Sequence, residues 1–202
     1  SDRAWLLGAG LVITGVRALV DRGFDACYSP DGTRIAFRGR GAGGWGVYVI
    51  PAEGEPDETL LWATEDNMQS IAWRPDGEAL LVMVATQTTV TVRGEERQQW
   101  LRRLMLVPAD GRGEVTQLLE DQYLAEAAWI PATGHIGMRG YVPQRGWAIV
   151  DFDPATGAQR PITTPNPRQI VMLPAWSADG GRLLVVRRSE KPADGAFSYD
   201  LL

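Results

Sequence analysis

Short apolar runs alternate with turn-forming residues along most of the chain, and one version of this pattern occurs four times. Each occurrence has an apolar stretch that ends in an aromatic residue, a turn of the Pro-Asp-Gly type or a variant of it, and a second aliphatic stretch. The four segments are Ala26–Phe37 (ACYSPDGTRIAF), Ala72–Val82 (AWRPDGEALLV), Ala128–Met138 (AWIPATGHIGM) and Ala175–Val185 (AWSADGGRLLV). Their aromatic anchors Tyr28, Trp73, Trp129 and Trp176 are 45, 56 and 47 residues apart. Such a period predicts one supersecondary unit per repeat.

Each unit continues with a third apolar stretch, and the first three units have a fourth. Asp-Gly provides the positive-φ position that a tight hairpin turn needs, and proline presets the entry to the turn. The third stretches are Trp45–Ile50, Trp100–Val107, Trp147–Val150 and Phe197–Tyr199, and the fourth are Thr59–Trp62, Val115–Leu118 and Gln159–Thr163. Four antiparallel strands in about 45 residues are typical of a propeller blade. We therefore predict an all-β fold, a β-propeller of about four four-stranded antiparallel blades.

The repeats predict a single propeller domain over residues 1–202. Its predicted parts are N-terminal strands in 1–23, blade 1 in 24–66, blade 2 in 67–121 with a long hairpin at 86–103, blade 3 in 122–166, and blade 4 in 167–202. Blade 4 lacks an outer strand, and two interpretations stay open. In the first, residues 12–19 provide that strand and close a four-bladed ring. In the second, residues 5–7 and 11–19 are the last strands of a preceding blade in a larger propeller. An open ring would favour oligomers, because its edge strands are unpaired.

Composition and charge narrow the class of protein. The 202 residues are 45% hydrophobic and 22% charged, which is enough for one core and argues against disorder. The formal charge is −5, from 20 basic and 25 acidic residues, so no overall positive field exists to hold nucleic acid. The apolar run Ala4–Val16 is shorter than the roughly 20 residues that a membrane-spanning helix needs. We expect no nucleic-acid partner and no membrane insertion by the propeller itself.

Residues for catalysis are sparse. The chain has one cysteine, Cys27, one histidine, His135, and no Gly-x-Ser-x-Gly. The glycines of Gly39–Gly46 fit a hairpin loop better than a phosphate-binding loop, and metal-ligand spacing is absent. We expect Cys27 to be a small buried apolar residue and His135 to be solvated or hydrogen-bonded. The prediction is no catalytic residue, no cofactor and no metal.

The aromatic-Ser-Pro-Asp-Gly turn with its flanking strands resembles the repeat of TolB-like and WD-like propellers. It also resembles the propeller domains of prolyl-oligopeptidase-like peptidases. The likeness covers about Phe24–Leu202, and families with this repeat include periplasmic scaffold proteins, peptidase gating domains and sensor ectodomains. The resemblance implies a propeller and favours an extracytoplasmic location. The third turn, Ile130–Gly134, lacks the aspartate, which favours a purely structural role for Asp31, Asp76 and Asp179.

Two surfaces are predicted to bind a partner. Loops that join each fourth strand to the next blade gather on one face of a propeller, and their carboxylates could hold a basic peptide or a cation; the alternative is a solvated acidic rim. These residues are Asp21, Asp25, Glu65, Asp66, Glu120, Asp121 and Glu126. The second surface is the hairpin at 86–103, predicted to turn at Gly94–Glu96 and either to dock an acidic or amphipathic partner or to pack on its own neighbour. Its candidate contact residues are Arg93, Arg97, Trp100, Arg102 and Arg103.

The leading functional prediction is a non-catalytic scaffold or binding module that presents its loops and hairpin to a macromolecular partner, most simply a protein. The alternative is the gating propeller of a larger serine peptidase. A third class is binding of a small ligand or glycan in the central channel, which aromatic residues near the loops, Tyr123 and Tyr141, could serve.

Overall fold

The predicted all-β architecture is confirmed. The structure is a computed structural model and describes residues 5–7, 11–13, 20, 23–41, 43–53, 55, 57–164, 166, 169–190 and 197–201. These residues form strands, turns and connecting segments, with no helix among them. Consequently the described part of the chain contains no long apolar helix of the kind that crosses a membrane.

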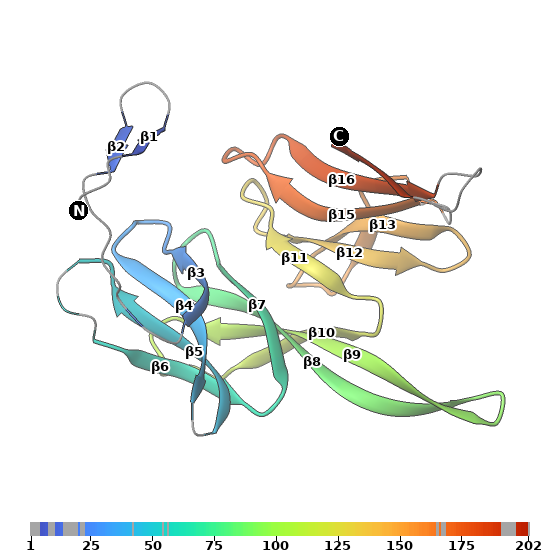
Figure 1. Ribbon diagram of the computed structural model, residues 1–202, viewed down its shortest axis with the longest axis horizontal. Coiled ribbons are helices and arrows are strands. Elements are labelled where there is room, and N and C mark those ends of the chain that lie inside the picture. Colours follow the sequence, from blue (N-terminus) through green and yellow to red (C-terminus); the bar gives the residue numbers. More distant parts are fainter. Residues whose placement is uncertain are drawn as a thin grey trace.

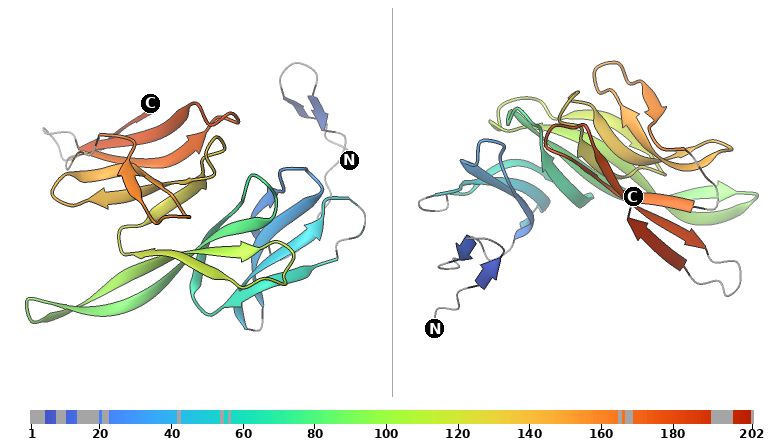
Figure 2. Two further views of the ribbon diagram at one scale, coloured as in Figure 1. Left: turned by 180° about the vertical axis from the view of Figure 1, so that it is seen from behind. Right: turned by 90° about the horizontal axis from the view of Figure 1, so that it is seen from above.

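Four antiparallel sheets follow one another in chain order (Figures 1 and 2). The first sheet contains β3 (Gly23–Tyr28), β4 (Arg34–Gly41), β5 (Gly44–Pro51) and β6 (Thr59–Thr64). The second contains β7 (Asn67–Trp73), β8 (Ala79–Val92), β9 (Glu95–Pro108) and β10 (Thr116–Asp121). The third contains β11 (Ala125–Trp129), β12 (Ile136–Val142), β13 (Gly146–Phe152) and β14 (Gln159–Pro161). The fourth contains β15 (Gln169–Trp176), β16 (Leu183–Glu190) and β17 (Phe197–Leu201).

The N-terminal strands form a small sheet of their own. β1 (Trp5–Leu7) pairs with β2 (Leu11–Ile13), and β17 pairs with β16. Within the described residues no strand pairing joins the fourth sheet to the first or to the N-terminal strands. Residues 14–19 lie outside the described part, so the lending of 12–19 to the fourth blade and the closure of a ring stay predictions.

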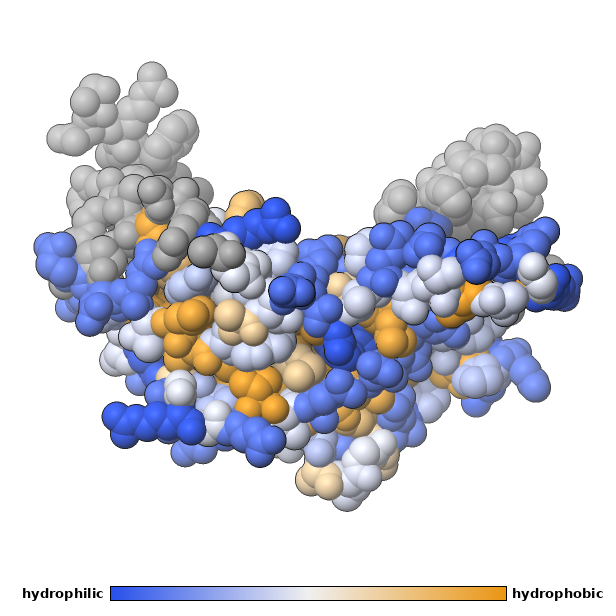
Figure 3. All heavy atoms as spheres, turned by 90° about the horizontal axis from the view of Figure 1, so that it is seen from below, coloured by the Kyte–Doolittle hydropathy of each residue, from blue (hydrophilic) through white to orange (hydrophobic). Residues whose placement is uncertain are grey.

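The sheets pack against one another through apolar faces. The core between the first and second sheets includes the fully buried Ala36, Val47 and Leu80, and that between the second and third includes Leu104 and Ile136. A third cluster, around Phe37 on the far face of the first sheet, is covered in part by Val20. On the face drawn in Figure 3, apolar side chains reach the surface in separate patches among polar ones. Burial of these apolar faces therefore holds the first, second and third sheets together.

The repeated turns share one hydrogen-bonding pattern. In the first, second and fourth turns a glycine N–H donates to the carbonyl three residues earlier, at 2.8–2.9 Å, and the glycine has a φ of 68–75°. These glycines are Gly32, Gly77 and Gly180. In the third turn the positive φ moves one residue later, to Gly134, and Thr133 Oγ1 accepts the N–H of His135. A threonine hydroxyl thus takes over part of the aspartate's role in the turn.

The turn aspartates are structural, as the sequence predicts. Asp31 Oδ1 accepts hydrogen bonds from Ser29 Oγ at 2.6 Å and from both the backbone N and the hydroxyl of Thr33, at 3.0 and 2.9 Å. Asp76 accepts from Arg74 Nε and from a backbone N–H, and Asp179 does so from Ser177 Oγ and a backbone N–H. Because these donors stabilise the ionised carboxylate, the pKa of Asp31 falls to about 2.

We expect Ser29→Ala to raise the pKa of Asp31 from about 2 toward the ordinary value of 3.8, because the Ser29 hydroxyl is its largest stabilising donor. A carboxyl with a lowered pKa in the folded state contributes stability above its unfolded pKa. That contribution is lost as the pH falls from 3.8 through about 2. Carboxyl carbon shifts in an NMR pH titration measure the change, and Asp179, whose donor is Ser177, is the internal reference. An unchanged Asp31 titration in Ser29→Ala would contradict this assignment.

Candidate functional site

Two of the predicted face carboxylates support contacts between neighbouring sheets, Asp25 through Arg38 and Glu126 directly. Asp25 and Glu126 occupy equivalent bulges of β3 and β11, with φ values of 50° and 51°. Asp25 pairs with Arg38 Nε at 2.7 Å, and Arg38 Nη1 donates to the Met68 carbonyl of the second sheet at 2.6 Å. Glu126 lies 3.5 Å from Arg139 Nε and accepts the N–H of Leu173, in the fourth sheet, at 2.9 Å. Glu126 therefore contacts the next sheet itself, and Asp25 holds the arginine that does so.

Asp66 connects the two predicted surfaces. Its oxygens accept from Thr86 Oγ1 and from Arg103 Nη2, each at 2.5 Å, and both partners lie at the root of the β8–β9 hairpin. Asp66 and Arg103 are only 25% and 27% exposed. An ion pair at this depth is better suited to fixing the direction of the hairpin than to capturing a partner.

The other acidic residues differ in their surroundings. Asp121 Oδ1 accepts the Tyr123 N–H at 2.6 Å, and neither Glu120 nor Asp121 forms an ion pair with any described residue. The same holds for Glu65, which lies in the turn between β6 and β7. Asp21 lies outside the described residues. The structure thus leaves Glu65, Glu120 and Asp121 as the described face carboxylates without a cationic partner.

The predicted hairpin projects well beyond the second sheet (Figure 1). Its strands pair from Ala79↔Pro108 to Val92↔Glu95, and its tip is the two-residue turn Arg93-Gly94, with φ values of 53° and 83°. These angles fit a type I′ turn. The predicted turn at Gly94–Glu96 is corrected, because Glu95 and Glu96 already belong to β9.

The five candidate residues of the hairpin separate into two groups. Arg93, Arg97 and Trp100 are exposed. Among the described residues Arg97 forms an ion pair with Glu95 alone, two positions earlier on the same strand, and Trp100 is 41% exposed. Arg102 and Arg103 lie at the root. Arg102 donates to Gln69 Oε1 at 3.2 Å and to the Gln122 carbonyl at 3.1 Å, which joins the second sheet to the linker before β11. Burial and the nearby Arg139 lower the pKa of Arg102.

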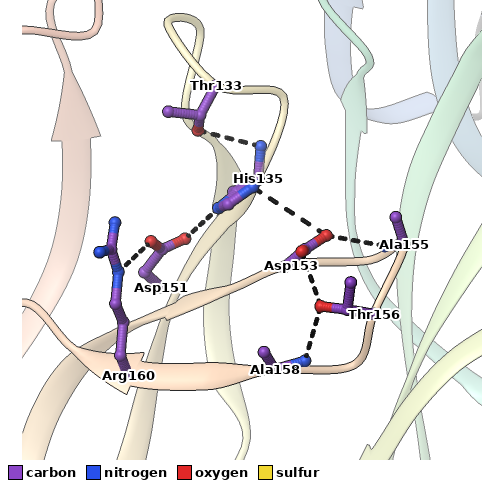
Figure 4. Close-up of polar contacts among 8 residues, drawn as sticks. All are labelled: Thr133, His135, Asp151, Asp153, Ala155, Thr156, Ala158 and Arg160. Atoms are coloured by element: carbon purple, nitrogen blue, oxygen red, sulfur yellow. Dashed lines mark hydrogen bonds and ion pairs between the residues drawn. The ribbon is translucent and has the colours of Figure 1, made fainter.

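His135 belongs to a polar cluster that the sequence did not predict (Figure 4). Its Nδ1 lies 2.9 Å from Asp151 Oδ1, and Arg160 Nε donates to Asp151 Oδ2 at 2.8 Å. Asp151 is only 4% exposed, and these two contacts give each of its oxygens a hydrogen-bond partner. Asp153 lies 4.0 Å from His135 Nε2, and its pKa is lowered by the Thr156 hydroxyl and the Ala155 N–H. The cluster ties β12, β13 and β14 together.

Cys27 is separate from this cluster. It lies on β3 in the first sheet, partly buried against the core that contains Trp73, and burial raises the pKa of its thiol. A thiol with a raised pKa is a poor nucleophile. Among the described residues no group of three or more histidine, cysteine, aspartate or glutamate side chains is arranged to hold a metal ion.

An aromatic cluster lies beside the unpaired acids. Tyr123 and Tyr141 have ring centroids 5.0 Å apart, and both rings pack against Trp147, at 5.9 and 5.5 Å. The sequence indicated the two tyrosines as aromatic residues near loops but not Trp147, which is assigned there to a strand. Tyr141 and Trp147 are a cross-strand pair of β12 and β13, so their spacing around the hairpin turn was the available signal.

Comparisons with known proteins show the fold. No protein-family model matches the chain, and the search of curated proteins found no match. TolB from Acinetobacter baumannii is 18% identical with a TM-score of 0.50, over 95% of this chain and 44% of that one. A putative TolB from Agrobacterium tumefaciens is 17% identical with a TM-score of 0.54, over 87% and 60%. An acylaminoacyl peptidase is 14% identical with a TM-score of 0.65, over 90% and 31%.

These likenesses confirm the resemblance to TolB-like and peptidase propellers. At such identities they establish the architecture alone. The chain spans less than two thirds of the length of each of these three structures.

Proposed function

We propose that this chain is a non-catalytic propeller module that presents its projecting β8–β9 hairpin to a partner protein. The observation that carries the proposal is the hairpin itself. Its strands extend past the sheet, and the exposed Arg93, Arg97 and Trp100 lie along it. Extensions from a rigid repeat scaffold are where contacts usually concentrate, and exposed tryptophan and arginine are the side chains most often found at binding hot spots. The TolB resemblance supports an extracytoplasmic location.

A photocrosslinking experiment tests this role. A benzophenone side chain at position 97 should form a discrete adduct in extract from the native source, whereas the same group at position 57, exposed in the connection between β5 and β6, should not. Unlabelled intact protein should compete for the adduct, and protein with a trimmed hairpin should not. Equal adducts from both positions would rule out the hairpin as the contact surface.

Trimming the hairpin should leave the fold intact. Replacing residues 89–98 by Asn-Gly keeps Thr88 opposite Gln99. Val92↔Glu95, the pair that closes the natural two-residue turn, lies four residues further along β8, so both are the same type of hydrogen-bonded or non-hydrogen-bonded pair and the same turn fits. Every residue removed is exposed or half-buried, so we expect the free energy of unfolding to change by less than about 1 kcal/mol. Urea unfolding followed by circular dichroism measures this. Loss of the cooperative transition would show that the hairpin is structural.

The second candidate function is the gating propeller of a larger peptidase. Two acylaminoacyl peptidases, one of them from Pyrococcus horikoshii, have TM-scores of 0.65 and 0.60 and support it. A parent reading frame that encodes Gly-x-Ser-x-Gly and a downstream histidine beyond this segment would favour this function over the scaffold.

A further inference from the structure

A groove lies between the root of the β8–β9 hairpin and the third sheet. It consists of two hollows that share Asp121, Tyr141 and Pro143. The outer hollow, of about 380 Å³, lies between Gln99 and Leu101 of the hairpin and Tyr123 of the linker before β11. The inner hollow, of about 200 Å³, is lined by apolar side chains that include Leu119, Leu124, Met138 and Val150. The groove is therefore open and polar at one end and apolar at the other.

The aromatic side chains of the groove are both exposed and mutually supported. Tyr123 is 41% exposed and Tyr141 is 38% exposed, although each ring also packs on its neighbours. The rings of Tyr141 and Trp147 meet edge to face at 75°, and those of Tyr123 and Trp147 at 83°. Rings held in this way lose little conformational entropy when a ligand binds.

The polar end of the groove is acidic. Glu120 and Asp121 form no ion pair with any described residue, and Asp121 uses one oxygen to accept the Tyr123 N–H. Arg102 faces Asp121 across the β9–β10 pairing, but its guanidinium donates to Gln69 and to the Gln122 carbonyl instead. The Asp121 carboxylate next to the exposed tyrosine rings favours a cation, which gains both charge-assisted hydrogen bonds and ring-face attraction.

We propose that this groove binds an extended peptide segment of a partner protein in which an arginine or lysine is next to an aliphatic residue. The cation lies between the Asp121 carboxylate and the tyrosine rings, and the aliphatic side chain enters the inner hollow. A nucleic acid is disfavoured by the charge of the site. The proposal rests on the proposed function in that the protein is a protein-binding module, but it uses a surface other than the hairpin tip.

Fluorescence anisotropy with the full chain tests the groove. The probe is a fluorescein-labelled peptide, Gly-Ser-Leu-Arg-Leu-Ser-Gly amide, and saturable binding is expected below about 1 mM. Replacing its arginine by citrulline, or both leucines by serine, should each weaken binding about tenfold or more, as should Asp121→Asn and Tyr141→Ala in the protein. Asparagine keeps the oxygen that accepts the Tyr123 N–H, so Asp121→Asn removes charge without removing the turn contact. The matched control is Asp57→Asn, at an exposed position between β5 and β6, which should bind as the unaltered protein does.

The outcomes separate the two proposals. Equal binding of the arginine and citrulline peptides, no binding up to about 1 mM, or preference for a neutral oligosaccharide over the peptide would each overturn the groove assignment. The trimmed hairpin keeps Gln99 and Leu101, so it should bind the peptide unchanged. If position 97 gives no adduct but the peptide binds, the hairpin contact is wrong and the groove assignment stands. If position 97 gives the adduct but the peptide does not bind, the groove assignment is wrong and the hairpin contact stands.

Discussion

Replacing Trp73 by alanine is expected to lower the free energy of unfolding by about 3–5 kcal/mol. The indole is only 8% exposed and lies in the core between the first and second sheets. Its Nε1 donates to the Cys27 carbonyl of the first sheet at 3.1 Å, and the Arg34 guanidinium lies 4.7 Å from the ring centroid. The substitution therefore removes apolar burial, a hydrogen bond and a cation–π contact at one junction.

The chain contains a matched control for this prediction. Tyr28 occupies the same repeat position in the first sheet, but it is 65% exposed. Tyr28→Ala should cost less than about 1 kcal/mol, because little apolar surface is lost. Urea unfolding of both variants, followed by circular dichroism, gives the comparison. Similar losses for the two would contradict the view that Trp73 stabilises the fold by packing on the first sheet.

The repeated turns and the strands beside them show how far the sequence determines the fold. The repeated turn defines the strand that precedes it and the strand that follows, because proline, aspartate and glycine act locally on the backbone. The third and fourth strands were also recognisable from their apolar residues, but their ends were not. Trp100–Val107, for example, is the inner half of β9. The predicted hairpin at 86–103 covers most of the outer half, but that half starts at Glu95, inside the residues predicted to form the turn.

The candidate site was less accessible from the sequence. The pairing of Asp66 with Arg103 joins residues 37 positions apart, and it depends on the register of β8 and β9. The contact of Glu126 with the Leu173 N–H requires positive φ at both residues, in bulges that no sequence motif indicates. The expected loop positions of a propeller predicted that these acids lie on one face. Which of them are free to bind a partner is decided by contacts between sheets.

Replacing Gly180 by alanine is expected to destabilise the protein by about 2–4 kcal/mol, from two separate causes. Gly180 has a φ of 68°, a conformation that strains residues with a Cβ. In addition, an added Cβ would lie 2.5 Å from the Ala132 backbone nitrogen and 2.6 Å from the Ala132 Cβ. Ala132 occupies the place of the aspartate in the third turn, so its short side chain helps the turns of the third and fourth sheets to approach this closely.

Gly157→Ala separates the two causes. Gly157 has a φ of 74°, and a Cβ added there would meet nothing within 4 Å, so this variant carries the backbone strain without the clash. We expect it to cost about 1–2 kcal/mol. The difference between the two variants, measured by urea unfolding, is then the contribution of the contact between the two turns. In Gly180→Ala, amide hydrogen exchange should increase first in β15 and β16, because the clash pushes their turn away from the third sheet. Equal costs for the two substitutions would show that the neighbouring turn yields freely and that the two sheets are held together by the Trp176–Gly137 approach instead.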